Sequence, residues 1–315
     1  LKNDDERFLR AVKSAVDDLK GSYAIEVISP LYPDRVIVVR KDSPLVIGKG
    51  KSENHIASDI PALLAYTKEF YLLDDNEYAV IYKDNIKFYD HTLTEHNKPI
   101  KNIEWDANAA EKGGFEHFML KEMYEQPKAI TDTFAPRIRD GEIVIEELGM
   151  TDEEIKAIKK IMIVACGSAY HTGVTSKYVF EGLARIPVEV DVASEFRYRD
   201  PILEEGTLVV VISQSGETAD TLAALRESKK RGAKVLGIVN VVGSSIAREA
   251  DNVMYTWAGP EIAVATTKAY SAQLIALYLL AMKFGNVRGT VNDTQLQDMI
   301  EDLKALPAQV EMLLN

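Results

Sequence analysis

Along the second half of the chain, short continuous runs of Val, Ile and Leu alternate with longer segments whose apolar residues recur every three or four positions. Strands buried on both faces have such continuous runs, and amphipathic helices have the longer period. The pattern predicts strands at 161–165, 188–192, 208–212, 234–239 and 253–257. It predicts helices at 169–184, 218–231, 245–250 and 267–284. This alternation is typical of an α/β fold, here a flavodoxin-like, doubly wound parallel sheet.

The first hundred residues have a different pattern, in which short strands are separated by turn residues. These strands are expected at 23–28, 35–40, 77–83 and 85–89. They predict antiparallel hairpins, and helical patterns at 1–20 and 58–66 indicate an α+β layered domain. Residues 101–150 are expected to connect the two parts, with one helix at 115–126 that stops at Pro127 and a short one before Gly141.

Composition narrows the classes of function. A length of 315 residues predicts about two domains, and a net charge of −12 argues against a nucleic-acid-binding surface. The single cysteine, Cys166, excludes an intramolecular disulfide and suits the cytoplasm, while the scattered histidines show no metal-ligand spacing. No apolar run reaches the roughly 18 residues needed to cross a membrane. Both ends have the pattern of amphipathic helices, from which we expect a piece of a longer protein.

Hydroxyl-bearing turns follow two of the predicted strands. In a doubly wound sheet, ligands bind beyond the carboxyl ends of the strands where the winding direction reverses. For the strand order 2-1-3-4-5, that point lies between the first and third strands, which end in the 166–169 turn (Cys-Gly-Ser-Ala) and the 213–218 loop (Ser-Gln-Ser-Gly-Glu-Thr). The topology therefore predicts that the two turns lie side by side.

The 213–218 loop carries the better chemistry for binding an anion. It offers three hydroxyls and one amide directly before a helix whose first N–H groups have no partner within the helix. Gly216 allows the backbone to approach a ligand closely. The loop is therefore expected to bind a phosphate group. The alternative is purely structural, with Ser215 or Thr218 as a helix N-cap and Gly216 in a tight turn.

Other residues near these turns have structural and functional interpretations. Cys166 is expected to be a small buried residue rather than a nucleophile, since no histidine or basic residue is adjacent. Glu217 is expected to be a carboxylate in the first turn of its helix rather than a catalytic base. The 195–199 cluster (Glu-Phe-Arg-Tyr-Arg) lines either the site, a subunit interface or solvated surface. The 266–268 segment (Thr-Thr-Lys) either caps the last long helix or faces the ligand.

The 213–218 loop matches the Ser-x-Ser-Gly-x-Thr phosphate loop of the SIS (sugar isomerase) domain. With this loop and further segments, the chain resembles the family of the isomerising glutamine–fructose-6-phosphate aminotransferases over nearly its whole length. The further segments are 43–48, 56–59, 121–127, 166–168, 193–199 and 267–269.

The resemblance implies an enzyme that hydrolyses glutamine in an N-terminal-nucleophile domain and passes the ammonia to fructose 6-phosphate. The product would be glucosamine 6-phosphate, with no metal or organic cofactor, in a cytoplasmic homodimer. It assigns 1–104 to the C-terminal part of the glutaminase domain, 105–150 to a linker and 151–288 to a first SIS domain. Residues 289–315 would begin the connection to a second SIS domain.

The resemblance also assigns roles to individual residues. The sugar phosphate would be held by Ser213, Gln214, Ser215 and Thr218. Further sugar contacts would come from Ser168, Val264 and Thr266, whereas Ala169 lacks the hydroxyl that enterobacterial-type sequences carry at its position. No catalytic residue is expected within this chain, because the glutaminase nucleophile and the isomerase Lys, Glu and His fall in other parts of the family's sequence. The chain alone is expected to be inactive.

Two other functions remain open. One is an SIS-domain deglycase relative that acts on amino-sugar adducts. The other is a non-catalytic SIS module that senses a phosphosugar, for which a DNA-binding helix-turn-helix would be expected upstream. The acidic hairpin pattern of the first 150 residues argues against the sensor, and absence of an N-terminal Cys from the full gene would favour the deglycase relative.

Overall fold

The computed structural model describes residues 2–102 and 112–314, which belong to two compact units. The first unit comprises Leu1–Glu111 and the second Lys112–Asn315, and each is considered by itself. Among the described residues, no helix combines the length and the apolar character needed to cross a membrane.

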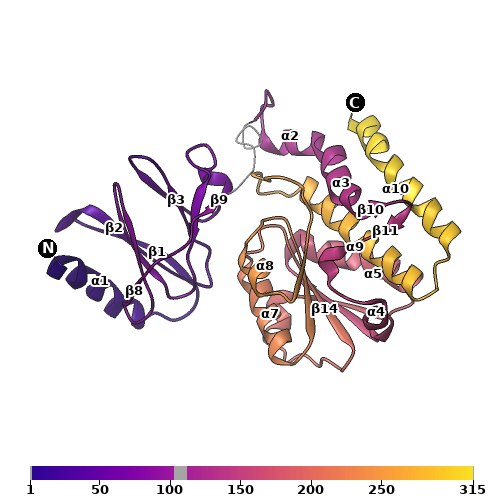
Figure 1. The fold of residues 1–315 in the computed structure, drawn as a ribbon, viewed down its shortest axis with the longest axis horizontal. Helices are drawn as coiled ribbons and strands as arrows, with labels where there is room; N and C mark the ends of the chain where they lie inside the picture. The colour runs from indigo at the N-terminus through magenta and orange to yellow at the C-terminus, as the bar shows by residue number, and fades with distance from the viewer. Residues whose placement is uncertain (1, 103–111, 315) are drawn as a thin grey trace. The chain divides into compact units, whose positions relative to one another are not determined.

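The first unit contains two antiparallel sheets and one long helix (Figure 1). The larger sheet has the order β1 (Tyr23–Ser29), β2 (Tyr32–Lys41), β6 (Tyr78–Tyr82), β7 (Ile86–Tyr89) and β8 (Glu95–His96). The smaller one has the order β4 (Asn54–Ala57), β3 (Val46–Lys49), β5 (Glu69–Leu72) and β9 (Lys101–Asn102). Helix α1 (Lys2–Asp17) packs its apolar stripe on one face of the larger sheet, where it meets Ile37, Val39 and Val80. Val38 and Ala79 face the other way and pack against Ile47 of the smaller sheet, so the predicted α+β layers are present.

The helix predicted at 58–66 is wrong. The segment contains a single 3₁₀ turn, η1 (Pro61–Leu63). Asp59 does accept a hydrogen bond from the backbone N–H of Ala62, as an N-cap would. The helix does not continue beyond this turn. The N–H groups of Tyr66 and Thr67 both donate to the carbonyl of Leu63, and strand β5 then begins at Glu69.

The second unit is built on a five-stranded parallel sheet. Its order is β13 (Val188–Val192), β12 (Lys160–Ala165), β14 (Thr207–Ser213), β15 (Lys234–Val239) and β16 (Asn252–Tyr255). This is the predicted order 2-1-3-4-5. The central strand β14 is buried along its entire length, which explains its uninterrupted run of apolar residues.

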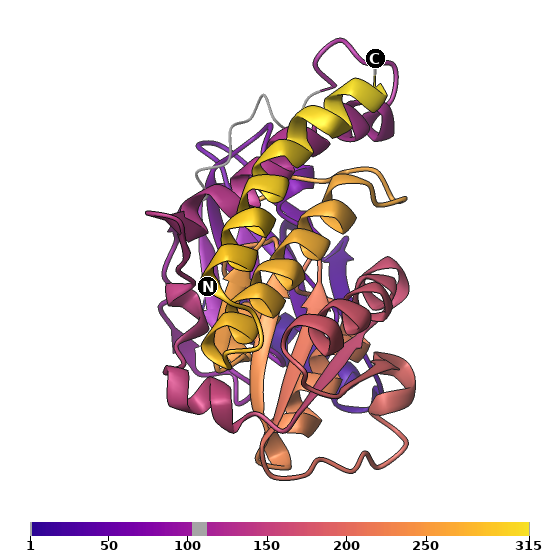
Figure 2. The same cartoon turned by 90° about the vertical axis from the view of Figure 1, so that its right-hand side faces the viewer.

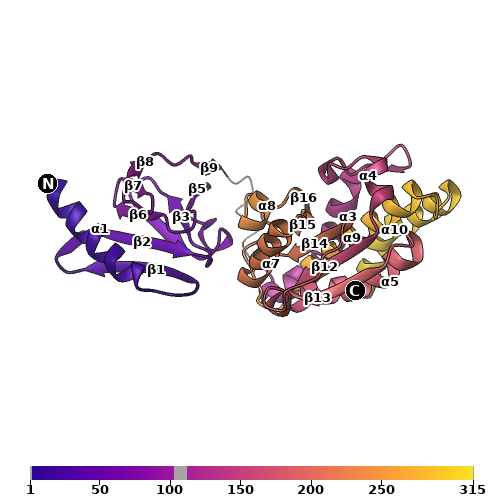
Figure 3. The same ribbon diagram turned by 90° about the horizontal axis from the view of Figure 1, so that it is seen from below.

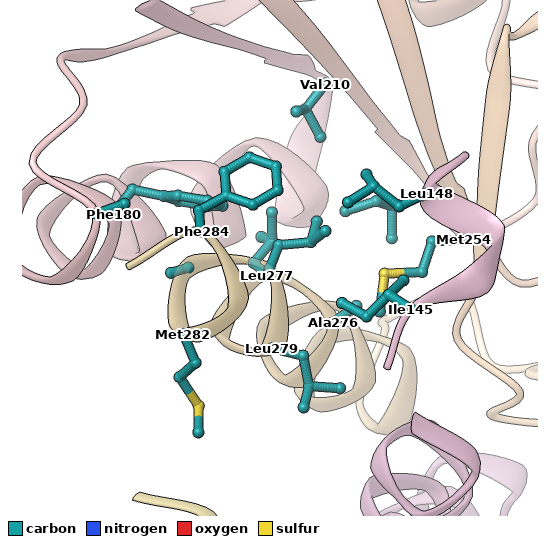
Figure 4. Packing of buried hydrophobic residues seen from close by; sticks show 14 of the residues in the cluster. Ile145, Leu148, Phe180, Val210, Met254, Ala276, Leu277, Leu279, Met282 and Phe284 are labelled. Atoms are coloured by element: carbon teal, nitrogen blue, oxygen red, sulfur yellow. The ribbon is translucent and has the colours of Figure 1, made fainter. Parts of the chain in front are cut away.

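Helices cover both faces of this sheet (Figure 3). One face carries α5 (Gly167–Leu183) and α9 (Lys268–Val287), and α3 (Gln126–Phe134) and α10 (Asp293–Leu314) join the same apolar cluster. The other face carries α6 (Ala193–Phe196), α7 (Ala219–Lys230) and α8 (Ser245–Glu249). Phe180 of α5 and Phe284 of α9 meet edge to face with ring centroids 6.1 Å apart (Figure 4). Figure 2 shows α10 running alongside α9.

Of the connecting region expected at 101–150, the first two residues form β9 of the first unit, 103–111 lie outside the described residues, and 112–150 belong to the second unit. Helix α2 (Phe118–Tyr124) ends before Pro127, as expected, and Pro127 itself lies in the first turn of α3. The remaining short elements are η3 (Ala135–Arg137), β10 (Ile138–Arg139), β11 (Glu142–Ile143), η4 (Glu146–Leu148) and α4 (Asp152–Ala157). Thr151 and Glu154 form a reciprocal capping box at the start of α4.

Candidate functional site

The two hydroxyl-bearing turns lie at the same edge of the parallel sheet. Strands β12 and β14 are direct neighbours, with Ala165 paired to Ile212 one position before the end of β14. The 166–169 turn also contacts the helix that follows the loop, because the hydroxyl of Thr221 in α7 donates to the sulfur of Cys166 at 3.9 Å. The expected juxtaposition of the 166–169 turn and the 213–218 loop is therefore present in the fold.

Hydrogen bonds within the 213–218 loop separate its residues into two groups. The hydroxyl oxygen of Ser213 accepts from the backbone N–H of Gly216 at 3.0 Å and lies 2.9 Å from the hydroxyl of Thr218. Ser213 is only 2% exposed, so its hydroxyl mainly holds the loop in shape. Gln214, Ser215 and Thr218 are partly exposed, although the hydroxyl of Ser215 also accepts from the backbone N–H of Glu217 at 3.1 Å.

Gly216 and the backbone around it fix the loop to the neighbouring elements. Its φ angle of +66° lies in the left-handed region, and a Cβ there would fall 2.0 Å from the hydroxyl oxygen of Ser244. The carbonyl of Gly216 accepts from the N–H of Ile246, and that of Gln214 accepts from the N–H of Asn240. A residue without a side chain is needed at position 216 because the loop packs directly against the start of α8.

The N terminus of α7 is open toward this edge. Thr218 occupies the N-cap position, yet its side chain makes no capping hydrogen bond and binds Ser213 instead. No side chain therefore caps α7, so the capping role considered for Ser215 or Thr218 is wrong, whereas the turn at Gly216 that the same interpretation includes is present. The first N–H groups of a 12-residue helix, with the partial positive charge of its dipole, thus face the same side as the partly exposed hydroxyls.

The prediction for Glu217 is wrong in detail. Helix α7 begins at Ala219, so Glu217 precedes its first turn. Its carboxylate instead accepts hydrogen bonds from the N–H and the hydroxyl of Ser245, both at 2.7 Å, and so occupies the N terminus of the next helix, α8. The carboxylate does bind a helix N terminus, but it is that of α8, and nothing in the local sequence indicates this pairing.

The 166–169 turn opens helix α5. Cys166 is its N-cap residue and makes no side-chain capping bond, and Gly167 has a φ angle of +56°. Ser168 is exposed in the first turn, while Ala169 packs against the apolar cluster under the sheet. Cys166 lies beside Thr221 and is half-buried, rather than buried as expected.

The segment before α9 carries the other two candidate residues. Val264 is fully exposed, and the hydroxyl of Thr266 donates to the carboxylate of Glu261 at 2.7 Å. The same carboxylate accepts from the N–H groups of Thr267 and Ala269 at 2.9 and 3.1 Å. Glu261 therefore caps α9, and the default expectation that the threonines do so is wrong. A lone glutamate seven positions before the first residue of the helix has no local signature that would have indicated this role.

The 195–199 cluster lies at the end of β13, and its arginines are held by carboxylates. Arg197 donates to Asp220 in the first turn of α7 at 2.8 Å, and Arg199 donates to Asp191 of β13 at 2.5 Å. Tyr198 is strongly exposed beside them. The cluster thus contributes a cation next to the N terminus of α7, although that cation is paired with Asp220.

Comparisons with known proteins agree with this geometry. Residues 154–283 match the family model of the SIS domain. The chain is 55% identical over 308 residues to glutamine–fructose-6-phosphate aminotransferase (isomerizing) of Caldanaerobacter subterraneus subsp. tengcongensis, covering 98% of this chain and 51% of that protein. For the enzyme of the same name from Clostridium tetani the identity is 54%, with the same coverage.

A solved structure has a similar fold. It is the C-terminal domain of glucosamine-fructose-6-phosphate aminotransferase from Francisella tularensis, with a TM-score of 0.60 and 44% identity. The match covers 63% of this chain and 56% of that one. The chain spans about half the length of the curated relatives it matches.

Proposed function

Because the chain belongs to the family of the glutamine–fructose-6-phosphate aminotransferases, we propose that it binds the phosphate of a phosphosugar through its 213–218 loop. Within the complete protein, this binding serves the glutamine-dependent amination and isomerisation of fructose 6-phosphate to glucosamine 6-phosphate. The observation that carries the proposal is the open N terminus of α7, flanked by partly exposed hydroxyls at the edge of the sheet where the winding reverses.

Each candidate residue has a distinct role in this proposal. The hydroxyls of Ser215 and Thr218, the amide of Gln214 and the first N–H groups of α7 donate to the phosphate oxygens, while Ser213 holds the loop. Ser168 in the first turn of α5 contacts the sugar from the neighbouring strand end. Val264 and Thr266 contact it from the segment before α9, with the hydroxyl of Thr266 oriented by Glu261.

The loop binds the phosphate mainly with neutral donors. No Lys or Arg lies within residues 213–218, and the nearby Arg197 is already paired with Asp220. Neutral donors and a helix dipole hold a phosphate in one orientation without the long, flexible side chain of a lysine. This arrangement suits a ligand that must be bound, processed and released.

The remaining assignments of the family extend the proposal to the rest of the chain. Residues 1–104 form the C-terminal part of a glutaminase domain, 105–150 a linker with its helices, and 151–288 a first SIS domain. Residues 289–315 lead toward a second SIS domain. Glutamine is then the second substrate of the complete protein, which forms a homodimer in the cytoplasm, and the bond-making residues lie outside this chain.

Calorimetric titration of the chain with fructose 6-phosphate and with glucosamine 6-phosphate tests the binding. The matched variant is Ser215→Ala combined with Thr218→Ala, which removes two hydroxyl donors from the loop and leaves its glycine in place. Loss of each hydrogen bond to a charged phosphate costs about 1.5–3 kcal/mol, so the double variant should bind at least about a hundredfold more weakly.

A control variant guards against a general loss of structure. Thr290→Ala removes a hydroxyl beyond the C-terminal end of α9 that donates to the carbonyl of Leu183, and should leave the affinity unchanged. Equal affinity of wild type and double variant, or no binding by a folded wild-type chain, would contradict the proposal.

A further inference from the structure

The 121–127 segment contains a buried carboxylate for which the phosphate site offers no role. Glu122 in α2 is 2% exposed. One of its oxygens, Oε1, accepts hydrogen bonds from the backbone N–H groups of Ile262 and Ala263 at 2.7 and 3.0 Å. A side chain from the first helix of this unit thus binds the backbone of a segment 140 residues later.

Burying this carboxylate is unfavourable. Its other oxygen, Oε2, is buried and has no hydrogen-bond partner among the described residues. Burial raises the pKa of Glu122, whereas the two N–H bonds act in the opposite direction. A buried charged group with an unsatisfied oxygen destabilises a fold unless its remaining bonds compensate. The bonds that Glu122 does make are those to the backbone of Ile262 and Ala263.

The same segment is held at both of its ends by other buried polar groups. At the start, the amide oxygen of Asn240 accepts from the hydroxyl of Thr256 at 3.0 Å and from the N–H of Ala258 at 2.9 Å. At the end, Glu261 caps α9 through Thr267 and Ala269. Residues 262 and 263 lie between these attachments, directly before the exposed Val264.

The neighbours of Glu122 in sequence fix α9 itself. Glu125 forms an ion pair with the buried ammonium group of Lys268 at 2.6 Å. The amide oxygen of Gln126 accepts from the hydroxyl of Ser271 at 2.7 Å. The 121–127 segment therefore holds the first turn of α9 and, through Glu122, the chain that leads into it.

We propose that Glu122 is a positioning residue, which holds the 262–266 segment in the conformation that presents Val264 and Thr266 to the sugar. This inference rests on the proposed function, because it assumes that these two residues contact the bound phosphosugar. The carboxylate acts only through the backbone of Ile262 and Ala263 and does not touch the ligand. It affects the sugar part of recognition and leaves the phosphate part, on the 213–218 loop, unchanged.

Two ligands separate these two parts. Fructose 6-phosphate contacts both the loop and the 262–266 segment, whereas inorganic phosphate can occupy only the loop. In the full chain, Glu122→Ala should weaken binding of fructose 6-phosphate about tenfold and leave binding of inorganic phosphate, measured by ³¹P line broadening, unchanged. Glu122→Gln retains a carbonyl oxygen that can accept both N–H bonds, and should restore most of the lost affinity.

Hydrogen exchange provides a readout that needs no ligand. The amides of Ile262 and Ala263 donate to Glu122, so their exchange should accelerate at least tenfold in Glu122→Ala and much less in Glu122→Gln. The matched control is Glu116→Ala, which removes an exposed carboxylate just before the same helix. It should change neither exchange nor binding.

The outcomes distinguish the inference from the proposed function. Unchanged exchange at Ile262 and Ala263 in Glu122→Ala would overturn the inference, as would an equal weakening of both ligands. The proposed function, in contrast, fails in the wild-type chain, if that chain binds fructose 6-phosphate no more tightly than inorganic phosphate.

Discussion

Replacing Gly216 by alanine tests whether the 213–218 loop owes its shape to close packing against α8. The substitution has two separate consequences. The backbone at position 216 has a φ angle of +66°, which a residue with a Cβ adopts only at a cost. The new Cβ would also lie 2.0 Å from the hydroxyl oxygen and 2.5 Å from the Cβ of Ser244, distances that no relaxed structure tolerates.

The magnitude follows from adding the two terms. The left-handed conformation costs about 1–2 kcal/mol for a residue with a Cβ, and overpacking costs about 1–3 kcal/mol, so Gly216→Ala should destabilise the second unit by about 2–5 kcal/mol. Ser244→Gly removes the side chain that causes the clash. In the double variant, only the conformational term should remain, about 1–2 kcal/mol.

Hydrogen exchange of the β14 and β15 amides, followed by mass spectrometry, measures the free energy of unfolding of this unit separately from the other. The free energy of unfolding of the double variant should exceed that of Gly216→Ala by at least about 1 kcal/mol. In a double-mutant cycle, this gain appears as a coupling energy between the two positions. Two results would refute the close packing of the loop on α8. One is a free energy of unfolding of Gly216→Ala within about 0.5 kcal/mol of the wild-type value, and the other is no gain in that free energy when Ser244→Gly is added.

Three further predictions concern stability. Gly173→Ala in α5 should destabilise the second unit by about 1–3 kcal/mol, since its Cβ would lie 2.7 Å from Ile163. Gly182→Ala on the same helix places its Cβ in open space and should stabilise the unit by about 0.5–1 kcal/mol, and urea unfolding measures both. Asp251→Asn should destabilise that unit at pH 7. Although burial alone would raise the pKa of Asp251, its bonds with Lys229 and Val235 lower it. Its contribution is therefore present above the unfolded pKa and lost as the pH falls through the folded value, so wild type and variant should converge in acid. Burial raises the pKa of Tyr78 to about 12. The folded first unit then keeps a proton that the unfolded chain releases, so its stability should fall as the pH rises from 10 toward 12. Tyr78→Phe should weaken this dependence in pH-jump unfolding and leave the part due to Tyr23, Tyr82 and Tyr89, whose pKa values burial also raises.

The sequence was sufficient for the elements whose signals are local. A strand buried on both faces needs apolar residues at every position, and β14 has them from Leu208 to Ile212. The alternation of such strands with helices restricts the topology to few arrangements, and the strand order with its switch point was predicted correctly. The 213–218 loop was found because hydroxyls and a glycine between strand and helix are local features.

The contacts that position the site could not be predicted, because their partners are distant in sequence. Glu122 binds Ile262 across 140 positions, and nothing near either residue indicates the pairing. Two helix caps were missed for a related reason. Glu217 caps α8, which begins only after strand β15, and Glu261 caps α9, which begins several residues later. The helix predicted at 58–66 failed because capping and helical spacing were read without the strand β5 that follows at Glu69.

A crystal structure of the chain with fructose 6-phosphate would test the central claim most directly. The phosphate should lie at the 213–218 loop, with its oxygens about 2.7–3.2 Å from the hydroxyls of Ser215 and Thr218 and the first N–H groups of α7. The sugar should extend toward Ser168 on one side and the 262–266 segment on the other. A phosphate bound elsewhere on the second unit, or a 213–218 loop that stays free of ligand at saturating concentration, would contradict the account.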